Sequence, residues 1–396
     1  MKLTQLSLAT MMIGYFSMHA FAADTLADAF KEGKLTGEIK AEYSDSNFIG
    51  KTHSDDISAY GGSLNFITSD FYGLKAGITF QTSHLANSDT AGAVFQDDLD
   101  TQGSVLSEAY LDYKISNTSL KVGRQYIYTP LVSSALDGKS SESILKDSFE
   151  GYVLTNTDLP STTFIAGYLS KYQAKTDGLG KSGEFNTFQD GAYTVYVKNT
   201  SIENVTLQAQ YLDENGMSSF EDKNAFYVQA DYVLAGHTLS AQYLSSTDKT
   251  KASGAQAGQI FGLRATGGLG IGKLGYIAAY TSSMDDGAVY TGAGTGTSDT
   301  LFTAMPVNGG GVAARANTDT VVGGLIVPIT SVTTIAYAGE SFSNDPGLGD
   351  VKAYGVIAIY PYDKNFLVKA NYEHVATEHV FTENTEIVRV YVSYKF

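Results

Sequence analysis

Apolar and polar residues alternate with a period of two along most of the chain. In the last twelve residues, Val388, Val390, Val392, Tyr394 and Phe396 share one parity, and Arg389, Tyr391, Ser393 and Lys395 share the other. This alternation predicts a strand with one apolar face and one polar face. The segments 205–211 and 226–234 show the same two faces.

Eighteen segments follow this pattern, each about ten residues long. They lie near 35–43, 57–68, 74–84, 105–115, 119–126, 148–157, 162–172, 190–198, 204–212, 224–234, 237–246, 258–266, 272–282, 318–328, 332–342, 352–360, 364–375 and 385–396. Nine long joints alternate with eight short ones such as Ala235-Gly236. Long loops at one end and tight turns at the other are typical of a transmembrane β-barrel.

The sequence therefore predicts an all-β fold, a transmembrane antiparallel β-barrel of about 18 strands. Hydrocarbon tolerates no unpaired backbone, so the sheet must close on itself. A barrel of this size is too wide for its own side chains to fill, and we expect a water-filled interior.

The N-terminus has the features of a secretory signal peptide. Lys2 is followed by an apolar run, Leu6 to Met18, and then by Ala20-Phe21-Ala22. We expect residues 1–22 to be cleaved and residues 23–396 to form a single barrel domain. The apolar run is too short for a membrane-spanning helix, which needs about 20 residues.

Composition agrees with an exported barrel. The chain has 27 tyrosines, 41 glycines, 6 prolines and no cysteine, and its mean hydropathy is −0.09. A barrel gives such a value because outward apolar residues alternate with inward polar ones. The net charge of −16, most of it on the long joints, argues against a nucleic-acid partner, and no motif calls for a cofactor.

The C-terminal strand resembles the recognition signal of bacterial outer-membrane barrels, with aromatic residues at the terminal position, Phe396, and the third-last position, Tyr394. The resemblance implies that these two residues are read by the barrel-assembly machinery of a Gram-negative outer membrane.

Three short motifs resemble the OprD-type outer-membrane porins, particularly the major porins of Campylobacter-group bacteria. They are the opening Ala23 to Gly33, the sequence LKVGRQ over 120–125 with Thr129-Pro130-Leu131, and DSFEG over 147–151. The resemblance implies an eighteen-stranded barrel that takes up small polar solutes, often carboxylates or amino acids. It also implies a third loop that folds inward and narrows the channel.

The third long joint, 127–147, carries short hydroxyls and both signs of charge, which suit a constriction. Its candidate constriction residues are Ser133, Ser134, Asp137, Lys139 and Glu142. The seventh long joint, 283–317, is rich in Gly, Thr and Ala and is a second candidate to fold inward.

Parity predicts a lumen wall of mixed charge. The candidate wall residues are Lys40, Glu108, Asp112, Asp231, Arg264, Lys369 and Arg389. The family is associated with a ladder of lumen arginines, whereas this chain has four arginines in all, so carboxylate specificity stays open. Arg124 shares the parity of Leu120 and Val122, and a bulge would be needed to bring it inward.

Two other patterns point to nucleotide binding or to an enzyme. Gly270 to Gly275 matches G-x-G-x-x-G but falls in a hairpin turn rather than before a helix. A barrel enzyme would need a dyad at the rim, for which Ser83 with His84 and Glu373 with His374 are candidates.

We therefore expect an outer-membrane porin for passive diffusion of ions and small hydrophilic solutes, with a weak preference for cations. The alternatives are a selective channel for amino acids or small carboxylates, a non-conducting structural or adhesive barrel, and an outer-membrane enzyme. Expected partners are membrane lipid, lipopolysaccharide and the assembly machinery, and whether the barrel is a monomer or a homo-trimer stays open.

Overall fold

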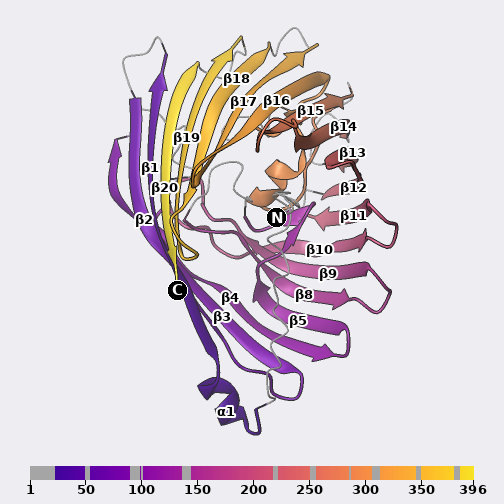
Figure 1. Ribbon diagram of the computed structural model, residues 1–396. Helices are drawn as coiled ribbons and strands as arrows, with labels where there is room; N and C mark the ends of the chain where they lie inside the picture. The colour runs from indigo at the N-terminus through magenta and orange to yellow at the C-terminus, as the bar shows by residue number, and fades with distance from the viewer. Residues whose placement is uncertain are drawn as a thin grey trace.

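Eighteen antiparallel strands form one closed sheet, because β1 pairs with β2 on one side and with β20 on the other (Figure 1). The computed structural model describes residues 23–49, 54–89, 99, 101–135, 144–216, 222–249, 256–284, 287–305, 313–344, 349–378 and 384–396. The predicted eighteen-stranded antiparallel barrel is confirmed. The predicted signal peptide, 1–22, lies outside the described residues.

The wall strands follow one another around the barrel in chain order. They are β1 (Lys34–Phe48), β2 (Ser54–Ile67), β3 (Leu74–Asp89), β4 (Gly103–Ile115), β5 (Thr118–Gln125), β8 (Ser148–Asn156), β9 (Thr162–Gln173), β10 (Asn186–Asn199), β11 (Val205–Asn215), β12 (Asp222–Leu234), β13 (His237–Asp248), β14 (Gln256–Gly268), β15 (Gly275–Ser283), β16 (Thr318–Ile329), β17 (Val332–Ser343), β18 (Val351–Pro361), β19 (Phe366–Thr377) and β20 (Thr385–Lys395). Helix α1 (Leu26–Lys31) precedes the wall, and the short strands β6 (Tyr128–Thr129) and β7 (Val132–Ser133) and the 3₁₀ helix η1 (Thr295–Thr300) lie within long joints.

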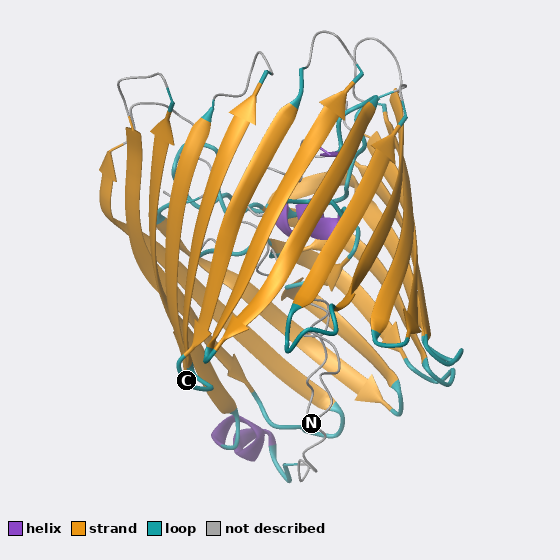
Figure 2. Ribbon diagram, turned by 45° about the horizontal axis from the view of Figure 1, so that its top comes forward, coloured by secondary structure: helices purple, strands orange, loops and turns teal. Residues whose placement is uncertain are grey.

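The short joints are tight hairpin turns. Leu234 pairs with His237 across a two-residue loop whose residues, Ala235 and Gly236, have φ of 51° and 85°. Positive φ at both positions matches the twist of the flanking strands. Helix α1 and the C-terminus lie at the same end of the barrel as these turns (Figure 2). No helix in the described ranges is long and apolar enough to cross a membrane.

The barrel closes where β1 pairs with β20, which we call the seam, and the seam extends to the C-terminal residue. The backbone N–H of Phe396 donates to the carbonyl of Gly37 at 3.0 Å, and the N–H of Gly37 donates back at 2.9 Å. Tyr394 lies opposite Ile39 one step further along the seam. The two terminal aromatic rings stack on each other with centroids 6.4 Å apart.

Aromatic residues form two belts on the outer face of the wall. Pairs six positions apart share the outward parity on several strands: Tyr60 and Phe66, Phe226 and Tyr232, Tyr354 and Tyr360, and Phe366 and Tyr372. Aromatic girdles at the two water interfaces are typical of transmembrane barrels. The belts therefore mark the band of wall that lipid would cover.

Candidate functional site: the inner face of the barrel

Two long joints fold into the barrel and pair with each other (Figure 2). We call residues 126–147 the third loop and residues 284–317 the seventh loop. Val132 of the third loop forms a parallel bridge with Ala293 of the seventh, and the N–H of Ala293 donates to the carbonyl of Leu131 at 2.9 Å. The Thr300 hydroxyl donates to the carbonyl of Pro130 at 2.7 Å. The expectation that both joints fold inward is thus confirmed for their described residues.

Glycines of the seventh loop permit this close approach. Gly292 has a φ of 124°, and a Cβ added there would lie 2.3 Å from the carbonyl oxygen of Leu131. Gly294 has a φ of 92°, and its Cβ would lie 2.2 Å from the carbonyl oxygen of Ser133. Both distances are shorter than van der Waals contact, so a larger residue would force the loops apart.

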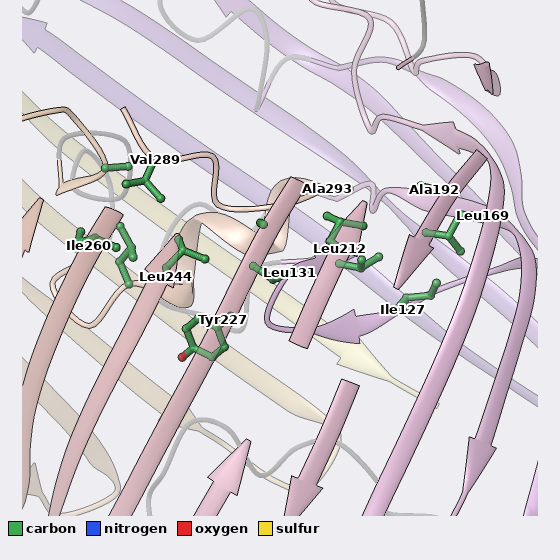
Figure 3. Packing of buried hydrophobic residues seen from close by; sticks show 14 of the residues in the cluster. Ile127, Leu131, Leu169, Ala192, Leu212, Tyr227, Leu244, Ile260, Val289 and Ala293 are labelled. Carbon is green, nitrogen blue, oxygen red and sulfur yellow. The ribbon is translucent and has the colours of Figure 1, made fainter. Parts of the chain in front are cut away.

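An apolar stripe on the inner wall receives the two loops (Figure 3). Each of six consecutive strands, β9 to β14, contributes at least one apolar residue that is 0% exposed: Leu169, Ala192, Leu212, Ala225, Leu244 and Ile260. Leu131, Val289 and Leu301 of the loops pack against them. Burying one such leucine stabilises the docked arrangement by about 1.5–3 kcal/mol. Hydrophobic packing therefore holds these parts of the loops against the inner face of β9 to β14.

Polar inner-wall side chains add directional contacts. Gln210 on β11 accepts a hydrogen bond from the N–H of Leu131 at 2.8 Å and donates to the hydroxyls of Thr129 at 2.8 Å and Thr194 at 2.9 Å. Gln242 on β13 accepts from the N–H of Phe302 at 2.9 Å. These two glutamines set the position of both loops on the wall.

Asp147 ties the end of the third loop to the seventh. Its fully buried carboxyl accepts from the N–H of Lys175 at 2.7 Å, the hydroxyl of Tyr172 at 3.0 Å, and the N–H and hydroxyl of Thr295. Burial raises the pKa of the Asp147 carboxyl, and the hydrogen bonds from Thr295 and the nearby Lys175 charge oppose that rise. One side chain thus joins three separate loop segments.

The strand register places the predicted wall residues on the inner face of the barrel. Gln210 identifies this face, because its side chain contacts the third loop inside the barrel. These residues are Lys40, Glu108, Asp112, Asp231, Arg264, Lys369 and Arg389. Asp231 accepts from Gln229 at 2.8 Å, and the Arg264 guanidinium lies 4.2 Å from the ring centroid of Phe302. Lys369 and Arg389 are 2% and 3% exposed, so little of either side chain is accessible from the interior of the barrel.

The predicted constriction residues that are described make contacts within the loops. Ser133 and Ser134 are 7% and 1% exposed. The Ser133 hydroxyl donates to the carbonyl of Ala135 at 3.2 Å, and the Ser134 hydroxyl accepts from the N–H of Ile127 at 3.0 Å. Their hydroxyls therefore serve the shape of the third loop. The other three candidates, Asp137, Lys139 and Glu142, lie outside the described residues.

The candidate dyads are separated by the wall itself, because neighbours in a strand point to opposite faces. Ser83 lies on the inner face and is 2% exposed, whereas His84 lies on the outer face against Tyr60. Glu373 is likewise inward and His374 outward. The G-x-G-x-x-G motif, 270–275, spans the turn between β14 and β15 and ends at Gly275, the first residue of β15, so it lies in a hairpin, as expected. Within the described part of the chain, no three His, Asp or Glu side chains gather as a metal site requires.

Comparison with solved structures finds the same fold in OprD-type and Occ-type proteins. Acinetobacter baumannii OccAB1 aligns with a TM-score of 0.74 at 11% identity over 95% of this chain and 99% of that chain. Pseudomonas aeruginosa OccK3 (OpdO) aligns with a TM-score of 0.72 at 13% identity, covering 94% and 97%. The outer membrane protein opdK of the same species gives 0.73 at 14% identity, covering 93% and 99%. No model of a protein family and no curated protein matches the chain.

These similarities confirm, for the fold, the resemblance to OprD-type porins drawn from the sequence. The narrower resemblance to the Campylobacter-group members stays a prediction.

Proposed function

We propose that this chain is an outer-membrane porin through which ions and small hydrophilic solutes diffuse down their concentration gradients. The observation that carries the proposal is the docking of the third and seventh loops inside a closed, eighteen-stranded barrel. Loops docked on the inner wall would narrow a wide cylinder, as expected of a channel that admits only small solutes. The two aromatic belts support a position in a membrane.

The proposed channel prefers cations weakly. Most of the net charge of −16 lies on the long joints, which would concentrate cations at the channel mouth by field focusing. The inner wall carries both signs of charge, so the preference is small.

A selective channel for amino acids is the second candidate. The inner wall of β12 to β14 brings the carboxylate of Asp231 and the guanidinium of Arg264 onto one surface, with the Ser240 hydroxyl between them in register. A surface with both signs of charge suits a zwitterion better than a simple carboxylate. Flux that saturates with one solute, and channel block by that solute, would favour this candidate.

The remaining expectations belong to the same proposal. Residues 1–22 would direct export and be removed, Tyr394 and Phe396 would be read by the assembly machinery, and lipopolysaccharide would surround the outer half of the wall. Exposure of 43% and 50% for the two aromatic side chains supports their recognition by another protein. A homo-trimer is compatible with the proposal but has no observation in its favour.

Planar-bilayer recording under a potassium chloride gradient tests the proposal. Stepwise conductance with a reversal potential of cationic sign is expected. Asp231→Asn, on the inner wall, should shift the reversal potential toward anions. Asp319→Asn is the matched control, because Asp319 lies on the outer face and accepts from the Tyr280 hydroxyl at 2.8 Å. Folded protein without conductance would refute the channel and favour a structural barrel.

A further inference from the structure

Three charged side chains lie side by side on the outer face of the wall. Arg124 on β5, Glu150 on β8 and Lys171 on β9 are paired in register. The Arg124 Nε lies 3.1 Å from one carboxylate oxygen of Glu150, and the Lys171 Nζ lies 2.9 Å from the other. We call these residues the outer-face triad. Arg124 therefore faces away from the lumen, in agreement with its parity.

The triad sits next to an aromatic belt. Tyr152, Tyr168 and Tyr193 pair in register directly across β8, β9 and β10, with ring centroids 6.2 Å and 5.1 Å apart. The triad occupies the next outward position toward the long-loop end of β8. Because aromatic belts mark the boundary of the hydrocarbon, the triad lies at the depth of lipid headgroups.

The triad has a net charge of +1 and spare hydrogen-bond donors. The guanidinium of Arg124 has five N–H groups, and within the described part of the chain it donates one hydrogen bond to Glu150 and a long one, 3.4 Å, to the carbonyl of Leu106. The ammonium of Lys171 has three donors and contacts Glu150. The Arg124 and Lys171 side chains are 33% and 36% exposed. The two cations can therefore donate to a further anion without leaving Glu150.

Aromatic and ionic contacts hold the cations in place. The Phe185 ring centroid lies 4.1 Å from the guanidinium carbon of Arg124, and Glu150 fixes both cations at once. A planar guanidinium held in this way is suited to phosphate oxygens. Elsewhere on the outer face, the ammonium of Lys352 lies 2.9 Å from the carboxylate of Glu340, and the carboxylates of Glu378 and Asp350 also interact with it, so this region has no excess of positive charge.

We propose that the outer-face triad binds a phosphate group of a phosphorylated glycolipid of the outer leaflet, with Arg124 and Lys171 as donors and Glu150 as the positioning residue. This inference rests on the proposed membrane location. The charge of the site complements a phosphate, and its depth favours a lipid over a free ion.

Native mass spectrometry of the purified full chain in detergent tests the inference, with bisphosphorylated and dephosphorylated lipid A as probes. Replacing both cations, Arg124→Gln with Lys171→Gln, should weaken binding of the bisphosphorylated lipid at least about tenfold, because two charge-assisted hydrogen bonds are lost. Binding of the dephosphorylated lipid should not change. Lys352→Gln removes an outer-face cation outside the triad and should leave both affinities as they were.

Equal affinities of the double variant and the wild type for bisphosphorylated lipid A would overturn the inference. So would an equal loss in Lys352→Gln, or competition by inorganic phosphate as strong as by the lipid. Should the double variant not fold, Lys171→Gln alone carries the test, since its side chain is the more exposed of the two. Channel conductance, recorded in parallel, should not change in the variants, because the triad faces away from the lumen. Lipid binding without conductance would refute the porin proposal and leave this inference standing.

Discussion

Replacing Asp147 by alanine should release the seventh loop from the third. The Asp147 carboxyl is fully buried and accepts four hydrogen bonds, from the N–H of Lys175, the hydroxyl of Tyr172, and the N–H and hydroxyl of Thr295. Alanine removes both acceptor oxygens and leaves the four donors without this partner. The hydrophobic packing on the inner wall remains.

The size of the effect follows from the unpaired donors. A buried donor without a partner costs about 1–3 kcal/mol, so four donors cost roughly 4 kcal/mol even at the low end of that range. Since about 1.4 kcal/mol changes an equilibrium tenfold, the undocked population should rise by nearly a thousandfold. Loops that are undocked only rarely in the wild type would then open often enough to be seen in a single-channel record.

Single-channel recording in planar bilayers is the assay. Asp147→Ala should show larger and noisier conductance, with transitions between levels that the wild type lacks. Asp177→Ala is the control, because Asp177 accepts backbone hydrogen bonds within residues 177–181 and makes none to the described residues of the seventh loop. Identical records for Asp147→Ala and the wild type, or the same noise in Asp177→Ala, would refute the reasoning.

The same residue predicts a pH dependence. Burial raises the pKa of Asp147 above its ordinary value of 3.8, so the folded chain holds the proton more tightly than the unfolded chain. The contribution of this group to stability is therefore greatest below pH 3.8 and falls as the pH rises through the raised pKa. Melting temperatures measured from pH 3.8 upward check this prediction. The melting temperature of the wild type should fall with rising pH more steeply than that of Asp147→Ala.

Other substitutions test the seam and the docking of the third loop. Gly37→Ala places a Cβ 2.4 Å from the Phe396 ring and 2.9 Å from a backbone oxygen, and should lower the melting temperature measured by heat-modifiable gel mobility. Gly323→Ala meets nothing within 4 Å and should not. Gln210→Leu leaves the Leu131 N–H buried without an acceptor, which should cost about 1–3 kcal/mol and raise conductance noise. An unchanged record for Gln210→Leu would show that hydrophobic packing alone fixes the loop.

The barrel could be predicted from the sequence because its signals are local. The period of two lies within each strand, and the joint lengths alternate between neighbouring strands. The number of such segments predicts the strand count, and parity predicts the faces of Lys40 and Arg264. The register agrees with both faces. Parity also indicates that Arg124 faces outward unless a bulge intervenes, whereas its ion pair with Glu150, which in turn binds Lys171, joins three strands and is visible only in the structure.

The arrangement of the loops could not be predicted in the same way, because it depends on contacts between distant residues. The bridge between Val132 and Ala293 joins segments that share no periodic pattern. The sequence favours Ser133 and Ser134 as constriction residues, and only the folded loop reveals that their hydroxyls hydrogen-bond to its own backbone. The aromatic belts could have been predicted from the sequence, because aromatic pairs six residues apart recur at outward positions of several strands.

Apolar residues at inward positions of the strands are the feature of the sequence that could have predicted where the loops dock. Three buried clusters lie on the inner wall, and each contains a residue from a long joint: Leu131 against β9 to β14, Met305 against β16 to β19, and Leu99 against Ile57 and Ile387. A leucine on an inner wall that faces water would be unfavourable, because exposing an apolar side chain to water costs free energy and exposing a polar side chain does not. An apolar residue on the inward parity therefore marks a place that a loop covers. It follows that the polar positions between these clusters bound the proposed passage, and that selectivity should respond to charges there rather than to charges beneath the docked loops.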